Sequence, residues 1–80
     1  MFLTELPDGG QAIVRCVTPA VPELGAADLR RLGELGFIPG EPLHLLRRGP
    51  GGREPLAVRV GDTLFALRWA EARCIEVDPA

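Results

Sequence analysis

Residues 31–49, RLGELGFIPGEPLHLLRRG, decide the fold of this chain. A helical pattern ends there at Gly36, and an extended pattern begins a few residues later. Gly36 suits the left-handed position just past a helix end, because glycine has no Cβ to clash in that conformation. Phe37 would then pack against Leu32 in the last helical turn, as in a Schellman motif. This stretch predicts a helix that is stopped abruptly and clamped by an aromatic ring.

The chain then turns and becomes a strand. Pro39 and Gly40 suit the two central positions of a type II turn, because proline presets its φ angle and glycine supplies a positive φ. The segment PLHLLRR at 42–48 is largely apolar and is expected to form a strand. The whole segment therefore predicts a tight, structural corner between helix and strand.

The helix before this corner is expected over residues 25–35. Four apolar side chains share one arc of it: Ala26, Leu29, Leu32 and Leu35. Arg30, Arg31 and Glu34 fall on the opposite arc. Gly33 lies within the apolar arc, and an interior glycine costs about 1 kcal/mol relative to alanine. We therefore expect Gly33 to permit the close approach of another backbone segment.

Short apolar segments separated by glycine and proline predict the rest of the fold. The expected strands are 11–17, 42–48, 56–60, 63–68 and 74–77, with one helical turn at 69–73 and a mobile turn at 49–55. Residues 56–60, LAVRV, alternate, with Leu56, Val58 and Val60 on one face and Ala57 and Arg59 on the other. Residues 61–62, Gly-Asp, suit a two-residue hairpin turn. Five short strands bury a common core by curling into a small barrel. We expect one domain over residues 1–80, mainly β with one inserted helix and a short C-terminal helical turn.

Composition narrows the class of protein. The 80 residues carry a net charge of −2, and the estimated pI of 5.3 lacks the basic signature of most nucleic-acid binders. No apolar run reaches the roughly 18 residues that indicate a membrane span. The first ten residues, MFLTELPDGG, have acidic residues where a signal peptide has basic ones. We expect a cytoplasmic protein.

The residues that carry chemistry are sparse. A ferrous site needs several converging imidazole, thiolate or carboxylate ligands. The single histidine, His44, is flanked by leucines on an expected strand and should point outward, and Cys16 and Cys74 are expected to be small apolar strand residues. No serine or cysteine nucleophile has a partner base, and the GPGG segment lacks the lysine of a phosphate-binding loop. We expect no metal site, no cofactor and no enzymatic activity.

Surface recognition remains, and three places are candidates for it. One is the set of arginines around the glycine-rich turn, either a basic tip or a solvated hairpin end. Another is the charged arc of the helix, either a docking surface or a solvated stripe. The third is the only tryptophan, either packed on the barrel or exposed as a binding anchor. The candidate partner-binding residues are Arg30, Arg31, Glu34, Arg47, Arg48, Arg53 and Trp69.

Three segments together resemble the FeoA family, ferrous iron transport protein A. They are LTELPDGGQAIV, LRRLGELGFIPGEPLHLLRR and PLAVRVGDTLFALRWAEARCIEV, and they cover nearly the whole chain. The resemblance implies an SH3-like β-barrel with a helix after the first strand. It also implies a small cytoplasmic partner of the FeoB transporter, a membrane protein with a cytosolic GTPase domain, so that the chain would sit at the inner membrane through this partner.

Two other functions stay open. The arginine cluster is compatible with a small nucleic-acid-binding barrel, although the acidic pI and the scarcity of aromatic side chains for base stacking argue against it. An arginine of the glycine-rich turn reaching a GTPase site would instead make the chain a regulator of GTP hydrolysis. The sequence leaves the oligomeric state and the surface that meets the partner open.

Overall fold

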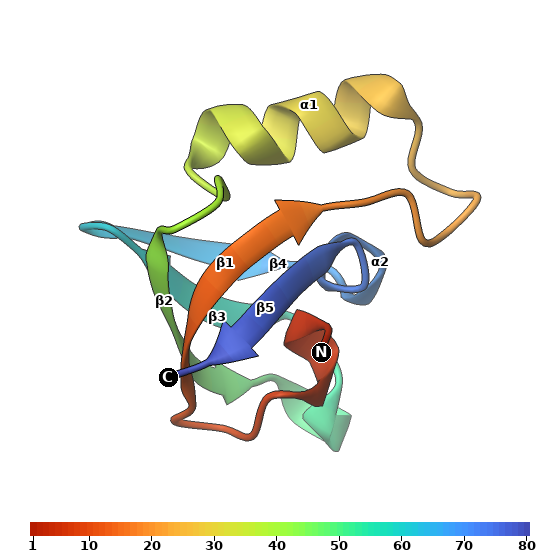
Figure 1. Cartoon of the computed structure of the whole chain (residues 1–80). Helices are drawn as coiled ribbons and strands as arrows, with labels where there is room; N and C mark the ends of the chain where they lie inside the picture. Colours follow the sequence, from red (N-terminus) through yellow and green to blue (C-terminus); the bar gives the residue numbers. More distant parts are fainter.

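Five antiparallel strands form one curled sheet in the computed structural model, which describes residues 1–80 (Figure 1). The order across the sheet is β4–β3–β2–β1–β5. The strands are β1 Gln11–Val17, β2 Pro42–Arg48, β3 Leu56–Val60, β4 Thr63–Leu67 and β5 Ile75–Pro79. The expected small β-barrel with one inserted helix is confirmed.

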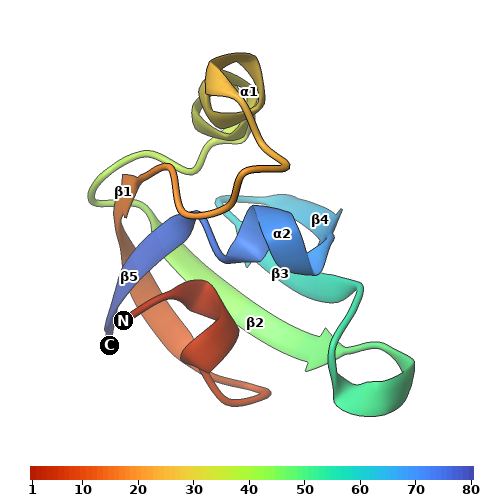
Figure 2. The same cartoon turned by 90° about the vertical axis from the view of Figure 1, so that its right-hand side faces the viewer.

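Helical segments close the barrel at its ends and along its open side. α1 spans Ala26–Leu35 between β1 and β2, and α2 spans Trp69–Ala72 between β4 and β5. β4 and β5 are the outermost strands, and α2 lies between them (Figure 2). A 3-10 turn at Leu3–Glu5, absent from the sequence prediction, contacts both α2 and β5. A second 3-10 turn, Pro50–Gly52, lies in the β2–β3 loop.

The core is entirely apolar. Seventeen hydrophobic residues are buried, and no polar or charged residue is. β3 illustrates how the strands supply it, because Leu56, Val58 and Val60 are buried while Ala57 is half-buried and Arg59 is exposed. This alternation is the one that the sequence predicted for 56–60, and it follows from the two-residue period of a strand.

The corner between α1 and β2 has the predicted hydrogen bonds. The Gly36 amide donates to the Gly33 carbonyl and the Phe37 amide to the Leu32 carbonyl, each at 3.1 Å, which is the Schellman pattern. Gly36 has a φ of 122°, and Phe37 is only 1% exposed. The ring of Phe37 also lies 5.5 Å, centroid to centroid, from the ring of Phe65 on β4. The corner thereby fixes where the chain enters the core.

The turn that follows is also confirmed, and it is bonded to β1. The Glu41 amide donates to the Ile38 carbonyl across the Pro-Gly pair, and Gly40 has a φ of 91°. The Gly40 amide donates to the Val14 carbonyl, while the Val14 amide donates to the Glu41 carbonyl, both at 2.8 Å. These bonds hold the corner against the first strand of the barrel.

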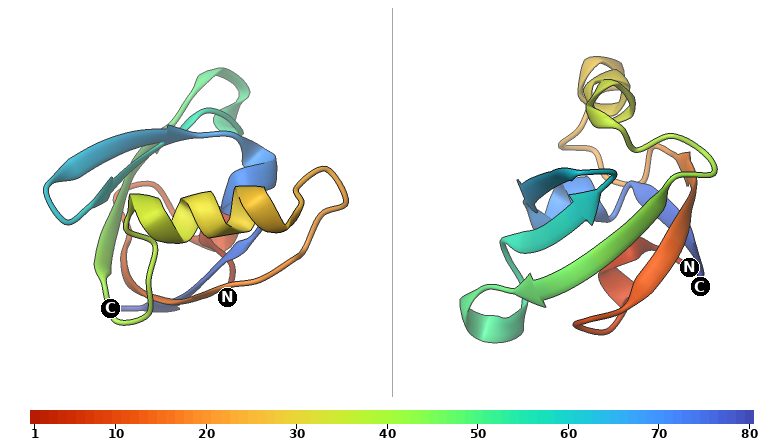
Figure 3. Two further views of the ribbon diagram at one scale, coloured as in Figure 1. Left: turned by 90° about the horizontal axis from the view of Figure 1, so that it is seen from above. Right: turned by 90° about the vertical axis from the view of Figure 1, so that its left-hand side faces the viewer.

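The expectation for Gly33 is wrong. A Cβ atom placed on this residue would meet no other atom within 4 Å, so no backbone approaches it closely. The reason is that α1 lies above one end of the barrel (Figures 1 and 3). The helix packs against the core through one narrow strip of side chains. Only Leu32 of α1 is fully buried, Leu29 and Leu35 are half-buried, and Ala26 is exposed.

Three strand boundaries differ from those predicted. β5 ends at Pro79 instead of residue 77. β4 ends at Leu67 instead of residue 68, because Arg68 is the N-cap of α2 and its amide donates to the Glu71 carboxylate. β5 begins at Ile75, and Cys74 instead closes the helical turn through its amide bond to the Glu71 carbonyl. Cys74 is fully buried nonetheless, as expected for a small apolar side chain.

Candidate functional site

A bulge in β2 separates the two arginines that the sequence placed together at a basic tip. Leu45 pairs with Val58, but Arg47 pairs with Ala57 and Arg48 with Leu56, so Leu46 is an extra residue. An extra residue shifts every later side chain to the opposite face of the sheet. Arg47 therefore shares the outer face with Ala57. Arg48 falls on the face of the buried Leu56.

Arg48 is engaged within the molecule, and the expectation that it lies at an exposed tip is wrong. Its Nη1 donates to Asp8 Oδ1 at 2.6 Å, and its Nη2 donates to the carbonyl oxygens of Thr4 and Leu6, each at 2.8 Å. Only 13% of the side chain is exposed. The hydrogen bonds of Arg48 thus hold the N-terminal turn against the end of β2.

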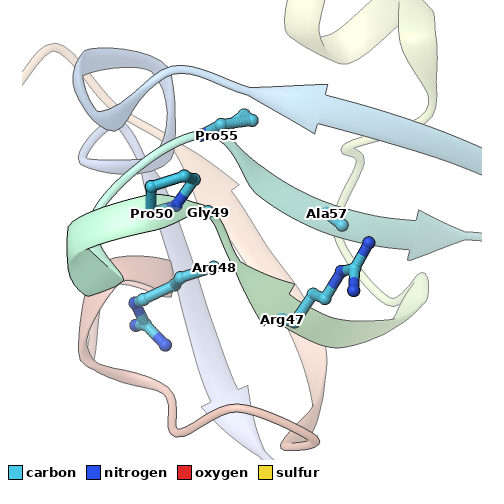
Figure 4. A pocket seen from close by; sticks show the side chains of 6 residues that line it. All are labelled: Arg47, Arg48, Gly49, Pro50, Pro55 and Ala57. Carbon is cyan, nitrogen blue, oxygen red and sulfur yellow. The ribbon is translucent and has the colours of Figure 1, made fainter.

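Figure 4 shows the two arginines leaving adjacent positions of β2 in different directions. Arg48 points toward the N-terminal segment, whereas Arg47 extends beside Ala57 of β3. Between them and the loop lies a shallow depression of about 590 Å³. Its lining consists of Arg47, Arg48, Gly49, Pro50, Pro55 and Ala57.

The glycine-rich loop, residues 49–55, is held by contacts that the sequence did not reveal. The guanidinium carbon of Arg53 lies 4.6 Å from the ring centroid of Trp69, a cation–π contact. The Trp69 amide donates to Glu54 Oε1 at 2.8 Å, and the Gly49 amide donates to the Pro55 carbonyl at 2.9 Å. The sequence predicted a mobile turn here and gave no sign of these contacts. Trp69 itself is half-buried and packs against the core, as its barrel-packing interpretation predicted.

The remaining candidate residues lie on α1. Arg30, Arg31 and Glu34 are exposed and take part in no salt bridge. They lie at the end of the molecule opposite the β2–β3 loop (Figure 3). The structure therefore does not gather the seven candidates into one surface, and Arg47 is the arginine of the expected basic tip that remains exposed without an internal contact.

The thiols and the histidine form no common site. No group of three or more His, Cys, Asp or Glu side chains is close enough to hold a metal ion. His44 is half-buried on the outer side of β2, opposite Arg59. Cys16 is half-buried, and its thiol donates to Glu76 Oε2 at 3.4 Å. Desolvation, and then the carboxylate of Glu76, raise the pKa of the Cys16 thiol.

Comparison with known proteins places the chain in a family. The model of the FeoA domain matches residues 1–79. The chain belongs to the FeoA family. Among solved structures, a FeoA from Stenotrophomonas maltophilia, crystallised with zinc, is 48% identical, and the match covers 98% of this chain and 89% of that one with a TM-score of 0.82. That protein is described as an SH3-domain protein and a candidate activating factor of bacterial ferrous iron transport.

Two further FeoA structures resemble the chain. FeoA from Chlorobium tepidum is 38% identical over 99% of this chain and 70% of that one, with a TM-score of 0.81. Iron(II) transport protein A from Clostridium thermocellum is 29% identical over 99% of this chain and 45% of that one, with a TM-score of 0.80. No curated protein matches the chain. The resemblance drawn from the sequence motifs is confirmed, as is the SH3-like fold that it implied.

Sequence reasoning missed two groups that the structure makes prominent. Glu54 bonds the loop to α2, and a carboxylate in a glycine-rich loop carries no signal of a partner 15 residues away. Arg59 lies beside His44 on the outer face of the sheet. The alternation of LAVRV had already placed Arg59 outward, but the sequence did not show that Arg59 pairs with His44.

No helix in the structure is long and apolar enough to span a membrane.

Proposed function

We propose that this FeoA-family protein is an accessory protein of ferrous iron uptake that acts by binding another protein. The observation that carries this proposal is the family match over residues 1–79, supported by 48% identity to a FeoA described in connection with transport activation. A barrel whose core is fully apolar offers its exterior for binding. The partner in this proposal is the cytosolic part of a FeoB-type iron transporter, and the protein acts in the cytoplasm without catalysing a reaction.

The exposed side chains of the predicted set are the candidates for the contacts with this partner. Arg47 on β2 and the α1 residues Arg30, Arg31 and Glu34 are all exposed. Arginine suits a carboxylate partner because its planar fork donates two parallel hydrogen bonds. Arg53 and Trp69 form a second, smaller anchor in which the indole face is already occupied by the guanidinium.

The alternative functions find less support. An arginine finger must be free to enter the partner's active site. Arg48 is held by three hydrogen bonds and Arg53 lies on Trp69, so of the three arginines at the expected tip only Arg47 is free to do so. A nucleic-acid surface needs aromatic platforms and clustered cations. Of the three phenylalanines, Phe37 is buried and Phe65 is half-buried against the core.

A direct binding measurement tests the proposal. The cytosolic domain of a FeoB-type transporter is immobilised, and this protein is titrated over it in the presence of GDP and of a GTP analogue. Saturable binding in at least one nucleotide state is expected, whereas no binding in either state would contradict the proposal. GTP hydrolysis measured in the same samples separates binding alone from regulation of the GTPase.

A further inference from the structure

The outer face of β2, β3 and β4 has a distinct composition. Because inward positions carry the core, the outward positions are set by the strand register: His44 pairs with Arg59, Arg47 with Ala57, and Arg59 with Leu64. We call this surface the outer sheet face. Its residues are His44, Arg47, Ala57, Arg59, Leu64 and Ala66.

The outer sheet face carries positive charge that nothing in the chain neutralises. Arg47 and Arg59 are exposed, and neither forms a salt bridge. No outward position of these three strands holds a carboxylate. On the other side of the barrel, by contrast, Arg15 of β1 lies 3.7 Å from Asp78 of β5. The outward positions of these three strands are thus free of acidic groups in a chain with a net charge of −2.

Two hollows of the molecular surface border this face, and each is lined by two of its residues. The first, of about 590 Å³, has Arg47 beside Ala57, and the second, of about 240 Å³, has His44 beside Arg59. Neither lining includes an acidic residue. Leu64, next to Arg59 on the edge strand β4, is 59% exposed, the largest exposed fraction among the large hydrophobic side chains. The face therefore combines two basic hollows with an apolar rim.

The distance between the two hollows indicates which peptide conformation can reach both of them. Ala57 and Arg59 are two residues apart on β3, and a strand rises about 3.3 Å per residue, so the hollows are about 7 Å apart. Alternate side chains of an extended peptide have this same spacing and point to the same side. In a helix, residues two apart do not share a face.

We propose that the outer sheet face binds an extended acidic segment of a partner protein, with carboxylates on alternate residues. One carboxylate pairs with Arg47, the next pairs with Arg59 and His44, and a neighbouring apolar side chain rests on Leu64. A peptide fits better than a nucleic acid, because no aromatic side chain faces outward here to stack on bases. Naming the transporter as the owner of this segment rests on the proposed function, whereas the binding face itself does not.

A model peptide tests the face independently of the transporter. The capped peptide SEVEVEVS is titrated into the isotopically labelled protein, with amide shifts and calorimetry as readouts. Controls are the glutamine peptide SQVQVQVS, the respaced peptide SEEVVEVS, in which no two glutamates are two residues apart, and a ten-nucleotide oligo-dT. The paired variant is Arg47→Glu with Arg59→Glu. Its matched control is Arg15→Glu with Arg73→Glu, two exposed arginines outside the candidate binding residues, which changes the net charge by the same amount.

The proposal expects shifts centred on residues 44–47 and 57–66 with SEVEVEVS, weaker binding in high salt, and a loss of affinity of at least about tenfold in the Arg47/Arg59 variant. The Arg15/Arg73 control variant should bind like the wild type. Equal binding of the respaced peptide or of oligo-dT, shifts confined to other surfaces, or no binding at millimolar peptide would overturn the proposal. Self-association of the free chain that the Arg47/Arg59 variant abolishes would assign the face to a second copy and also overturn it.

The transporter measurement separates the two proposals. If the cytosolic domain binds the wild type and the Arg47/Arg59 variant equally, the outer sheet face is not the docking surface, although the proposed function stands. If the domain binds neither protein while SEVEVEVS binds the wild type, the proposed function fails and the acidic-segment site stands.

Discussion

The corner at residues 36–40 and the loop at residues 49–55 are both built from glycine and proline, but they are held in different ways. In the corner, Gly36 and Phe37 bond to carbonyls three and five residues back, and the Phe37 ring is buried in the core. In the loop no residue is fully buried, and the chain is held by Arg53 and Glu54 reaching Trp69. The corner is part of the core, and the loop is tied to the surface of α2.

This difference has an energetic consequence. Breaking the corner removes a buried ring and forces a strained backbone, and both effects are felt by the whole fold. Breaking the loop removes contacts at the surface, where solvent compensates for most of what is lost. Substitutions in the two regions should therefore differ by several-fold in their effect on the free energy of unfolding.

The largest effect is expected from Phe37→Ala. Truncating a buried phenylalanine costs about 3–5 kcal/mol, which is about the whole stability expected of an 80-residue domain. The variant should be largely unfolded by circular dichroism at 25 °C. Ile38→Ala, next to it but 46% exposed in the wild type, should stay folded. A folded, cooperatively melting Phe37→Ala protein would contradict the role given to the corner.

The second effect contrasts two glycines of the same helix end. Gly36→Ala should destabilise the protein by about 1–3 kcal/mol, because φ at this position is 122° and the added Cβ would lie 3.3 Å from Val60 Cγ1. Gly33→Ala should stabilise it by about 0.5–1 kcal/mol, because its Cβ meets open space within a helix. Urea unfolding of both variants measures the difference, and equal effects of the same sign would contradict this contrast.

A third effect concerns the end of β2, where the loop begins. Arg48→Met keeps the aliphatic stem but leaves the carbonyls of Thr4 and Leu6 without their donor. The expected loss is about 1–2 kcal/mol by thermal or urea unfolding. Arg47→Met, one residue earlier on the outer face, should change stability by less than about 0.5 kcal/mol. If the two variants lose the same stability, the bulge has been placed wrongly.

The smallest effect is expected in the loop itself. Arg53→Ala removes a cation–π contact at an exposed site, which is worth about 0.5–1 kcal/mol. Global stability should barely change, but the emission of Trp69, the only tryptophan, should shift as its ring becomes hydrated. Arg73→Ala, also exposed but forming no cation–π contact with the ring, serves as the control. An unchanged Trp69 spectrum in Arg53→Ala would show that the guanidinium does not cover the ring in solution.

The comparison also explains how much of the structure was predictable. The helix end and the turn of the corner were predictable, because the bonds that define them join residues five or fewer apart: Gly36 to Gly33, Phe37 to Leu32 and Glu41 to Ile38. The alternation of buried and exposed residues in β3 was also predictable, because the two-residue period of a strand is local. The contacts of Arg53 and Glu54 with Trp69 were not predictable, since nothing in a glycine-rich segment specifies a partner 15 or more residues away.

The candidate site was predicted only in part, and the cause lies in the bulge of β2. Arg47 is exposed, as the sequence predicted. One extra residue at Leu46 moved Arg48 to the core side, where it bonds the N-terminal turn. A bulge leaves little mark in a run such as HLLRR, so the separation of the two arginines needed the structure. The narrow contact between α1 and the barrel, which leaves open space beside Gly33, could likewise not be predicted from the sequence.

The most direct test of this account is an amide-shift map of the labelled protein with the cytosolic domain of a FeoB-type transporter. The account predicts that the perturbed amides lie on the outer sheet face, around Arg47, Arg59 and Leu64, and that Arg47→Glu with Arg59→Glu abolishes them. Perturbations confined to α1 or to the 49–55 loop, or a domain that leaves every amide unchanged, would contradict it.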